Sequence, residues 1–475
     1  MRVCVIGGGI SGLTAAYRLK KGGAVVDLLE GSARVGGLLG SEQIEDHVVE
    51  TGADSILTDK PWALRLAEEL GLTHQIIGTN PKKRGAHIVH RGRLERIPAG
   101  FSLIAPTDLL ALARSPVVSA RGTMRAALDL VVPRRDAARS DESLEHFVVR
   151  RLGRELFERL AQPLAGGIYG ADPKKLSLAA TMPRFLELER EYGSVIRGLR
   201  ARARQLPVDK NGAAGARYGL FAAFSGGMQT FVSALEKELE GQIETRSLVT
   251  SLGRTAEGYR IEVQGAVRSY DAVVLALPSY VAAQVVRGFD ASLSRALSEI
   301  DYASAATITL SWPRAAIPHP LDAFGYVVPA IEQRSVIAST WASVKYERRA
   351  PVDKALLRVF VGGHRGQHLV QYDERELIGI AKRELGELIG VSAAPEWTRV
   401  QRYVRAMPQY HVGHLDRVAR IEALERQHEG FALAGNAYRG VGIPDAVKSG
   451  EDAAARLLGE DAQPYARSST LSASS

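Results

Sequence analysis

A short run of glycines near the N-terminus is the part of this sequence whose spacing most clearly predicts chemistry. Gly7, Gly9 and Gly12 form a Gly-x-Gly-x-x-Gly pattern directly after the β-branched run at 2–6. Glycines at this spacing let a diphosphate approach the backbone, and the start of a following helix offers free N–H groups to that anion. A carboxylate follows at Glu30, where it accepts hydrogen bonds from ribose hydroxyls and repels a 2′-phosphate. The pattern predicts a dinucleotide site that does not take NADP.

The residues around this pattern predict the β-α-β unit that must position it. We expect a strand at 2–6, a helix at 13–21 and a second buried strand at 24–29. Ile10 and Ser11 lie inside the glycine turn and complete the predicted phosphate-binding residues.

A second cluster, Arg34-x-Gly36-Gly37, places a cation and bare backbone a few residues past the predicted ribose position. This pattern resembles the flavin amine oxidase and protoporphyrinogen oxidase superfamily, and it favours FAD over NAD. The glycines at 362–366 have the wrong spacing for another dinucleotide site. With no internal NAD domain expected, a reduced flavin must pass its electrons to a diffusing acceptor, most simply O₂.

Near the C-terminus, a glycine-rich loop at 435–445 follows an expected strand at 431–434 and precedes an expected helix at 446–458. Its small residues permit close contact with a planar ring, and Pro444 and Asp445 suit a helix start. The positive end of that helix can hold negative charge that develops on a reduced flavin. The predicted cofactor contacts in this segment are Gly435, Gly442 and Ile443.

Two segments of different character separate the parts of the chain that are predicted to bind the dinucleotide. Residues 106–200 show helix-period patterns, whereas residues 300–395 alternate expected strands with a helix at 374–388. We predict an α/β fold with a discontinuous Rossmann-like FAD-binding domain, a mixed α+β substrate domain and an inserted helical domain. The predicted limits are 1–80, 225–300 and 396–465 for the FAD-binding domain, 81–105 and 301–395 for the substrate-binding domain, 106–224 for the helical domain and 466–475 for a disordered, Ser-rich tail.

Several stretches together resemble the porphyrinogen oxidases of haem synthesis, and the resemblance covers nearly the whole chain. It implies an FAD- and oxygen-dependent six-electron oxidation of coproporphyrinogen III to coproporphyrin III, with peroxide formed and the flavin N5 as the reactive position. Oxidation of protoporphyrinogen IX is the alternative that the resemblance leaves open. The stretches that carry it are 7–12, 52–55, 166–169, 185–198, 226–229, 407–414 and 435–445.

The resemblance also implies residues that hold the substrate and the flavin. Phe324 matches an aromatic residue that packs on the tetrapyrrole, and Lys60 matches a lysine of relatives that oxidise the four-carboxylate substrate. Ala86 stands where protoporphyrinogen-type relatives carry a propionate-binding arginine, for which Arg84 could substitute. The remaining implied substrate residues are Gly167, Ile168 and Val327, and the remaining implied flavin contacts are Gly52, Ala53, Asp54, Ser55 and Val249.

Composition and charge narrow the possible partners. The net charge is +8, and the segment 81–139 alone holds twelve basic and four acidic residues, which favours an anionic partner. One cysteine, Cys4, allows no internal disulfide and fits a cytoplasmic protein, and no apolar run is long enough to span a membrane. We expect a tetrapyrrole and O₂ as partners, no nucleic acid, and a location in the cytoplasm with peripheral contact at the inner face of the cell membrane. The oligomeric state stays open.

Other interpretations share the same fold. His411 and His414 have the spacing of a metal pair, but no carboxylate or cysteine accompanies them, so we expect no metal. An amine oxidase needs a pocket for a cationic amine, and a carotenoid-type desaturase needs a long apolar tunnel. A flavoprotein that only binds a partner or carries porphyrin is a third possibility. The basic segment favours the anionic porphyrinogen over an amine.

Overall fold

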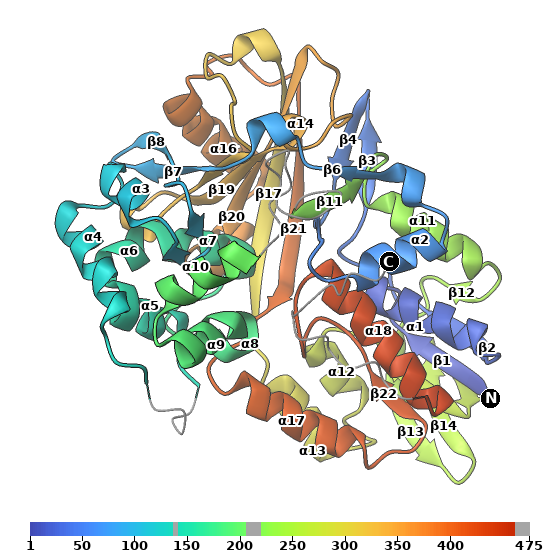
Figure 1. The fold of residues 1–475 in the computed structure, drawn as a ribbon. Coiled ribbons are helices and arrows are strands. Elements are labelled where there is room, and N and C mark those ends of the chain that lie inside the picture. The colour runs from blue at the N-terminus through green and yellow to red at the C-terminus, as the bar shows by residue number, and fades with distance from the viewer. Residues whose placement is uncertain (136–140, 206–219, 461–475) are drawn as a thin grey trace, which may run out of the picture.

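The computed structural model describes residues 1–135, 141–205 and 220–460, and the predicted tail at 466–475 lies outside them. Its first part is a five-stranded parallel sheet in the order β12-β2-β1-β16-β22 (Figure 1). Pieces from both ends and the middle of the chain pair in this sheet, as the predicted discontinuous Rossmann-like arrangement requires. The strands are β1 (Arg2–Ile6), β2 (Val25–Leu29), β12 (Ile243–Glu244), β16 (Ala272–Leu275) and β22 (Phe431–Leu433).

Helices cover one face of the parallel sheet. Alternate residues of β1 pack to opposite sides, so that Val3 and Val5 face the helices and Cys4 and Ile6 face the opposite layer. The helices α1 and α18 pack closely, since a Cβ at Gly450 would lie 2.2 Å from the Ser11 carbonyl oxygen. This layer consists of α1 (Ile10–Lys21), α2 (Trp62–Glu69), α11 (Gln229–Glu238) and α18 (Ile443–Leu458).

The opposite face of the parallel sheet packs against a small antiparallel sheet and three helices, which bury Tyr259, Ile261 and Phe431. The small sheet contains β13 (Val249–Thr255), β14 (Gly258–Val263) and β15 (Ala266–Tyr270), and the helices are α12 (Ser279–Val285), α13 (Ala291–Ser298) and α17 (His414–Glu425).

A mixed seven-stranded sheet forms the second part, in the order β21-β17-β20-β19-β18-β7-β8. The helix α16 (Glu374–Ile389) covers one face, and Asp373 and Glu376 form a capping box at its start. The strands are β7 (His87–His90), β8 (Arg93–Arg96), β17 (Tyr302–Pro313), β18 (Gly325–Val327), β19 (Val336–Trp341), β20 (Lys354–Gly362) and β21 (Trp397–Pro408).

The strand β21 corrects one predicted boundary. The prediction placed residues from 396 onward in the FAD-binding domain, but β21 pairs antiparallel with β17 from Ser311↔Trp397 to Tyr302↔Pro408 and forms the edge of the seven-stranded sheet. Nine residue pairs, with one register shift between Ala303 and Ala305, keep β21 with that sheet, and the chain returns to the parallel sheet only afterwards. The other predicted domain limits remain predictions.

The third part is helical, as the sequence predicts for 106–200. A π-helical turn at Phe157–Ala161 separates α6 from α7. The buried core includes Phe147, Leu160 and Phe185. The helices are α3 (Leu109–Arg114), α4 (Ala120–Ala127), α5 (Leu144–Leu152), α6 (Arg154–Leu156), α7 (Gln162–Tyr169), α8 (Leu178–Thr181), α9 (Pro183–Tyr192) and α10 (Val195–Gln205).

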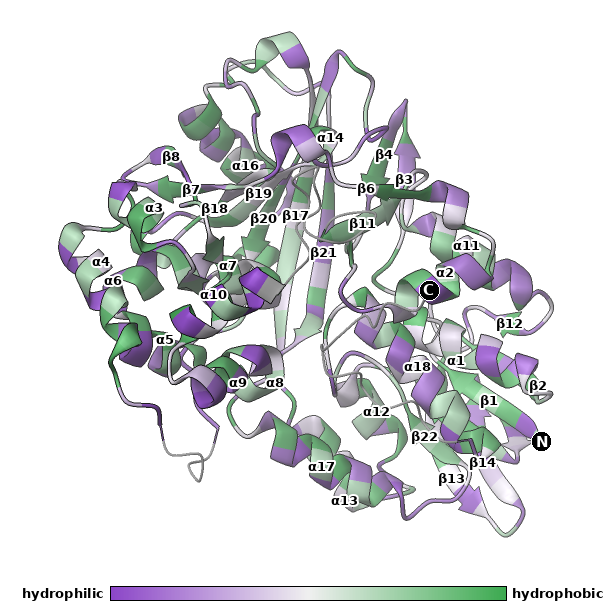
Figure 2. Ribbon diagram, in the orientation of Figure 1, coloured by the Kyte–Doolittle hydropathy of each residue, from purple (hydrophilic) through white to green (hydrophobic). Residues whose placement is uncertain are grey.

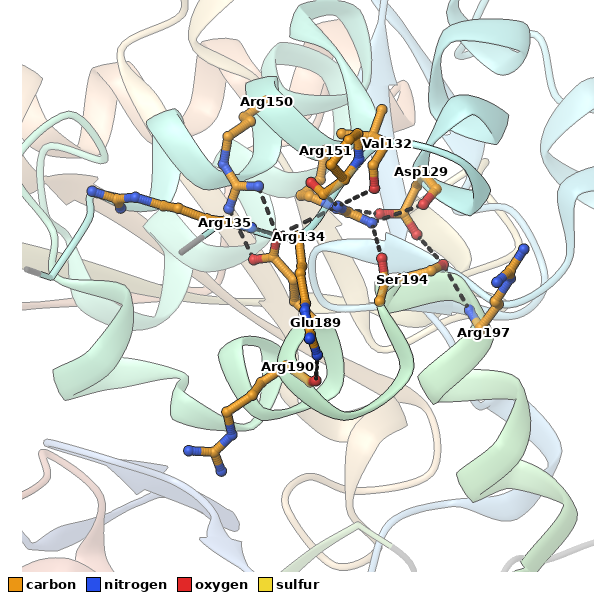
Figure 3. A network of polar contacts seen from close by, with 12 residues as sticks. Asp129, Val132, Arg134, Arg135, Arg150, Arg151, Glu189, Arg190, Ser194 and Arg197 are labelled. Atoms are coloured by element: carbon orange, nitrogen blue, oxygen red, sulfur yellow. Dashed lines mark hydrogen bonds and ion pairs between the residues drawn. The ribbon is translucent and has the colours of Figure 1, made fainter. Parts of the chain in front are cut away.

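A buried ion pair holds the helical part together (Figure 3). Arg151 is fully buried, and its Nε donates to Asp129 Oδ1 at 2.5 Å. The same guanidinium donates to the carbonyl oxygens of Val132 and Gly193, at 3.0 and 2.8 Å. Asp129 also accepts a bond from the Ser194 hydroxyl at 2.6 Å. The network therefore joins α5 to the segments before α5 and after α9.

Short elements connect the three parts. They are β3 (Ser41–Ile44), β4 (His47–Glu50), β5 (Ile56–Leu57), β6 (Ile76–Gly78), β9 (Phe101–Ser102), β10 (Ala105–Pro106), β11 (Phe221–Phe224), α14 (Ala342–Lys345) and α15 (Gly363–Gly366). Among the described residues, no helix is both long enough and apolar enough to cross a bilayer.

Candidate functional site

The glycine turn between β1 and α1 leaves open space at one of its three glycines. Gly7 has φ +105°, and a Cβ there would lie 2.4 Å from the Ala276 carbonyl oxygen. A Cβ at Gly12 would lie 1.9 Å from the Gly7 carbonyl oxygen. By contrast, a Cβ at Gly9 would meet no atom within 4 Å. At Gly7 and Gly12, a side chain would collide with the backbone of this chain, which explains why these residues are glycines. Gly9 instead borders open space at the start of α1, which we call the Gly9 cradle.

The cradle has the donors that a diphosphate needs. α1 begins at Ile10, and its first intrahelical bond runs from Leu13 N to Gly9 O at 2.9 Å. The N–H groups of Ile10, Ser11 and Gly12 come before that bond, so the helix itself does not use them. A dinucleotide diphosphate fits this free space and these donors.

Glu30 lies at the end of β2, as predicted, and its carboxylate is held in place by backbone donors. Glu30 Oε2 accepts from Gly8 N and Oε1 accepts from Ser32 N, both at 2.7 Å. A carboxylate has about four acceptor positions, so two remain for ribose hydroxyls.

The structure gives Arg34 a different immediate role from the predicted phosphate contact. Its guanidinium donates to three loop carbonyls, at 3.0 Å to Val35, 3.0 Å to Leu39 and 2.9 Å to Gly37. These bonds fix the glycine pair that follows, and a Cβ at Gly37 would lie 3.1 Å from Gly9 Cα. Arg34 therefore shapes the wall of the cradle, and a direct contact with phosphate stays a prediction.

The predicted flavin segment at 52–55 is anchored to β20 and α14 by two cations that the sequence did not reveal, one buried and one partly buried. Arg358, on β20, donates to Gly52 O at 2.7 Å, and Lys345 pairs with Asp54 at 3.0 Å. Burial alone would raise the pKa of Asp54, but Lys345 and Arg358 outweigh it and hold that pKa below its usual range. The Tyr346 hydroxyl donates to Ser55 Oγ at 2.8 Å. Ala53 is exposed within this anchored segment.

Nothing in the local pattern of Arg358 or Lys345 marks them as partners of residues about 300 positions earlier. Only the three-dimensional fold brings β20 and α14 against the segment at 52–55.

Val249, a predicted flavin contact, has its side chain buried in the core at the start of β13. Any contact of Val249 with a cofactor would use its backbone.

Side chains of the motif at 407–414 hydrogen-bond to the backbone of the C-terminal glycine-rich loop and hold it in place. The Tyr410 hydroxyl donates to Asn436 O and accepts from Gly440 N, both at 2.7 Å. His414 Nε2 lies 2.8 Å from Tyr438 O, and its ring stacks on Tyr410 with centroids 3.9 Å apart. Because Nε2 donates to a carbonyl, that nitrogen is not available to a metal.

The clamped loop leads into α18, which begins at Ile443 after the N-cap Gly442, close to the predicted helix start. Gly435 has φ +133°, in keeping with its glycine identity. Gly442 N donates to Asp445 Oδ2 at 3.3 Å, so the first turn of the helix is closed by its own carboxylate.

Lys60 is brought to this helix start by a long-range ion pair. Lys60 Nζ lies 2.6 Å from Asp445 Oδ1 and 2.8 Å from Oδ2. The Asp445 side chain is 5% exposed and that of Lys60 is 38% exposed. Burial raises the pKa of Asp445, and Lys60 offsets part of that rise. Lys60 is therefore a partner of Asp445 as well as a candidate contact for a substrate.

The predicted substrate residues lie in two adjoining groups. At the end of α7, a Cβ at Gly167 would lie 3.9 Å from Val327 Cγ1, and the Ile168 side chain is exposed. Phe324 lies just before β18, where its N–H donates to Gly85 O at 3.0 Å. This bond places Phe324 beside the segment that holds both Arg84 and Ala86.

The basic segment at 81–139 lies partly beside these residues, because its strand β7 pairs with β18 at Val327↔Ile88, and its expected role toward an anionic partner stays a prediction. It runs through β7, β8, α3 and α4 (Figure 1). Arg96 pairs with Asp322 at 2.5 Å, and Arg125 donates to the carbonyl oxygen of Arg150 at 2.8 Å. These side chains support the fold, and the segment's residues 136–139 lie outside the described ranges.

One group of metal-type side chains occurs in the described ranges, at His87, His319 and Asp322. Leu321 N donates to His319 Nδ1 at 3.0 Å, so Nε2 of His319 carries the proton. Arg96 already neutralises Asp322. This arrangement disfavours a cation, and the absence of a metal stays a prediction.

Comparisons with known proteins agree with this geometry. A family model described as flavin containing amine oxidoreductase matches residues 10–458. A coproporphyrinogen III oxidase from Bacillus subtilis (strain 168) is 31% identical over 96% of this chain and 97% of its own length. Protoporphyrinogen oxidase 2 from Arabidopsis thaliana is 28% identical over 95% of this chain and 93% of its own length. A solved protein from Exiguobacterium sp. 255-15, provisionally assigned as a protoporphyrinogen oxidase, superposes with a TM-score of 0.86 and 29% identity over 97% of this chain and 99% of its own.

Proposed function

The chain belongs to the flavin-containing amine oxidoreductase family and is an FAD-dependent oxidoreductase, and we propose that it oxidises coproporphyrinogen III to coproporphyrin III with O₂ as the electron acceptor. The observation that carries the proposal is the similarity to a coproporphyrinogen III oxidase along almost the full length of both chains. Protoporphyrinogen IX is the alternative substrate, supported by the similarity to a protoporphyrinogen oxidase at slightly lower identity.

The proposed reaction removes six electrons and six protons from the porphyrinogen, and three O₂ accept them to give three H₂O₂. Bound FAD supplies the two-electron acceptor for each of three successive steps. The protein needs no nucleophile or metal for this chemistry, and its contribution is to place both molecules and to set the charge around them.

The residues of this chain divide that work. The Gly9 cradle and the start of α1 bind the diphosphate, while the Glu30 carboxylate is placed for the ribose. Tyr410 and His414 hold the loop before α18 in one conformation, which fixes the positive end of α18 where it would stabilise negative charge on a bound flavin. Lys60 reduces the negative charge that Asp445 would otherwise bring to this place.

The proposal is tested with FAD-loaded protein and two substrates under air. We expect porphyrin fluorescence to rise with coproporphyrinogen III, with a larger kcat/KM than with protoporphyrinogen IX. A larger kcat/KM for protoporphyrinogen IX would select the alternative substrate. Failure to oxidise either compound would refute both.

The helical part also supports contact with an anionic membrane surface, as a further element of the proposal. Apolar side chains are exposed on and next to α3 and α4, at the outer edge of the molecule (Figures 1 and 2), and Val131 is 72% exposed. Arg114 and Arg121 lie on the same two helices. Apolar residues flanked by cations are typical of proteins that lie on anionic lipid. The exposed apolar residues are Leu110, Met124, Leu128 and Val131.

Sedimentation with lipid vesicles tests this contact. The protein should pellet with vesicles that contain anionic lipid and much less with zwitterionic vesicles. Replacing Met124 and Val131 together by Glu should abolish pelleting without changing turnover of soluble substrate. Equal pelleting of this variant and the native protein would contradict the proposed surface.

A further inference from the structure

A narrow pocket lies between the end of α7 and α15, beside the predicted substrate residues. The two elements touch through glycines, since a Cβ at Gly363 would lie 3.2 Å from the Gly170 carbonyl oxygen. The enclosed space is small, about 20 Å³, so it admits a group the size of a carboxylate oxygen or a water molecule. Most of the residues that line the pocket are small and uncharged. The ionisable side chains among them are His364 and Arg365. The residues that line it are Gln162, Pro163, Gly166, Gly167, Gly170, Val328, Ile337, Gly362, Gly363, His364 and Arg365.

Arg365 is the cation of this pocket, and no carboxylate among the described residues pairs with it. Its Nη1 donates to Ala330 O at 2.9 Å, which leaves most of its five N–H groups for another acceptor. Arg365 is exposed as a whole residue, but partial burial of its guanidinium lowers its pKa, and no neighbouring anion counteracts that effect. By contrast, Arg334, which does not line this pocket, pairs with the carboxylates of Glu384 and Glu387 at 3.0 and 2.8 Å.

His364 lies next to this cation in sequence and helps to fix the position of α15. Its backbone N–H donates to Gly170 O at 2.9 Å, which fixes α15 against α7. Burial lowers the pKa of His364, while Asp172 acts in the opposite direction. The ring also hydrogen-bonds to the backbone of Ala171, so the one N–H of the neutral imidazole is already engaged there.

The pocket and the predicted substrate site share a wall. Gly167 lines the pocket and also approaches Val327, and Val328 lines the pocket one residue further along. Lys60, the lysine that the resemblance assigns to the substrate, is already engaged by Asp445. A second cation next to Gly167 could therefore bind one of the other carboxylates of a substrate that has several.

We propose that the α7–α15 pocket binds a propionate carboxylate of the porphyrinogen, with Arg365 as its charged partner. This inference rests on the proposed function and adds a specificity-determining position to it. An arginine offers two parallel N–H groups to a carboxylate, which suits a planar acid better than a lysine would. The pocket contributes to substrate binding equally before and during the reaction, so it acts on KM more than on kcat.

Binding of the product coproporphyrin III to FAD-loaded protein tests the pocket without turnover. Arg365→Gln should raise the Kd by about tenfold, which corresponds to about 1.4 kcal/mol. Arg375→Gln removes the same charge from an exposed position on α16 and should leave the Kd unchanged. The tetramethyl ester of coproporphyrin III has no carboxylate, so Arg365→Gln should not weaken its binding.

The outcomes separate this inference from the proposed function. If the native protein oxidises a porphyrinogen but Arg365→Gln binds coproporphyrin III as tightly as the native protein, the pocket assignment is wrong. An equal loss of affinity for the acid and the ester would also overturn it, because a structural defect would then explain the loss. If the native protein oxidises no porphyrinogen, the proposed function itself fails.

Discussion

The open space at Gly9 leads to a prediction that separates cofactor binding from folding. A valine at this position would fill the cradle at the start of α1, where the structure places no protein atom within 4 Å of the new Cβ. Gly9 has φ −67°, which valine adopts without strain. Gly9→Val should therefore fold while losing FAD.

The size of the loss follows from the bonds that the side chain blocks. Two charge-assisted hydrogen bonds from backbone N–H groups to phosphate contribute about 1.5–3 kcal/mol each. Losing both weakens FAD binding by about 3–6 kcal/mol, or roughly 10²- to 10⁴-fold. Valine is also a poorer N-cap than glycine, which costs about 1 kcal/mol of stability.

The assay compares flavin content and thermal unfolding of purified variants. Gly9→Val should be colourless and unfold at nearly the temperature of the FAD-free native protein. Gly288→Val is the matched control, because a Cβ there also meets no atom within 4 Å and the residue is remote from the cradle. It should keep its flavin. Stoichiometric flavin in Gly9→Val would refute the assignment of this space to the diphosphate.

Three further predictions concern charged residues. Arg151→Met should lower the free energy of unfolding of the helical part by about 3–5 kcal/mol, because it leaves Asp129 buried without its partner (Figure 3); urea denaturation measures this, and a loss below about 1 kcal/mol would contradict it. Lys60→Glu should lower kcat/KM about tenfold more for coproporphyrinogen III than for protoporphyrinogen IX, because it repels an added carboxylate; equal losses would mean that Lys60 acts only through Asp445. Burial lowers the pKa of His414 to about 4, so the unfolded chain binds a proton at a higher pH than the folded chain. Stability should therefore fall as the pH drops from about 6.5 to 4, by up to roughly 3 kcal/mol from this group, and a His414→Gln variant that keeps the full pH dependence would refute its origin.

The parts of the fold that depend on local patterns could be predicted from the sequence. The strand at Arg2–Ile6 has the predicted bounds, and α16 at Glu374–Ile389 extends one residue past its predicted end. α1 begins at Ile10, three residues before the predicted start, because the glycine turn itself provides the first turn of the helix.

Features that depend on distant pairing could not be predicted in this way. β21 reads as an ordinary strand, and only its pairing with β17 shows which sheet contains it. The same limit applies to the site, where Glu30 follows from spacing but the bond from Arg358 to Gly52 and the Lys60–Asp445 pair do not. Such contacts join segments about 300 to 400 residues apart, and no periodicity in the sequence records them.

The structure can also give a residue a different role from the one that its sequence pattern predicts. Arg34 was identified by its place beside Gly36 and Gly37, yet its guanidinium binds the carbonyls of that loop. The motif at 407–414 was identified by resemblance alone, and its hydrogen bonds supply the physical reason for it. Tyr410 and His414 hold the backbone of the loop at 436–440.

The central claim is tested most directly by the stoichiometry of a single reaction. FAD-loaded protein is mixed with coproporphyrinogen III in air-saturated buffer, and the O₂ consumed, the H₂O₂ formed and the coproporphyrin III formed are measured together. The account predicts three O₂ consumed and three H₂O₂ formed for each porphyrin, above the slow spontaneous oxidation seen without protein. Flavin-loaded protein that forms porphyrin no faster than buffer alone would contradict it.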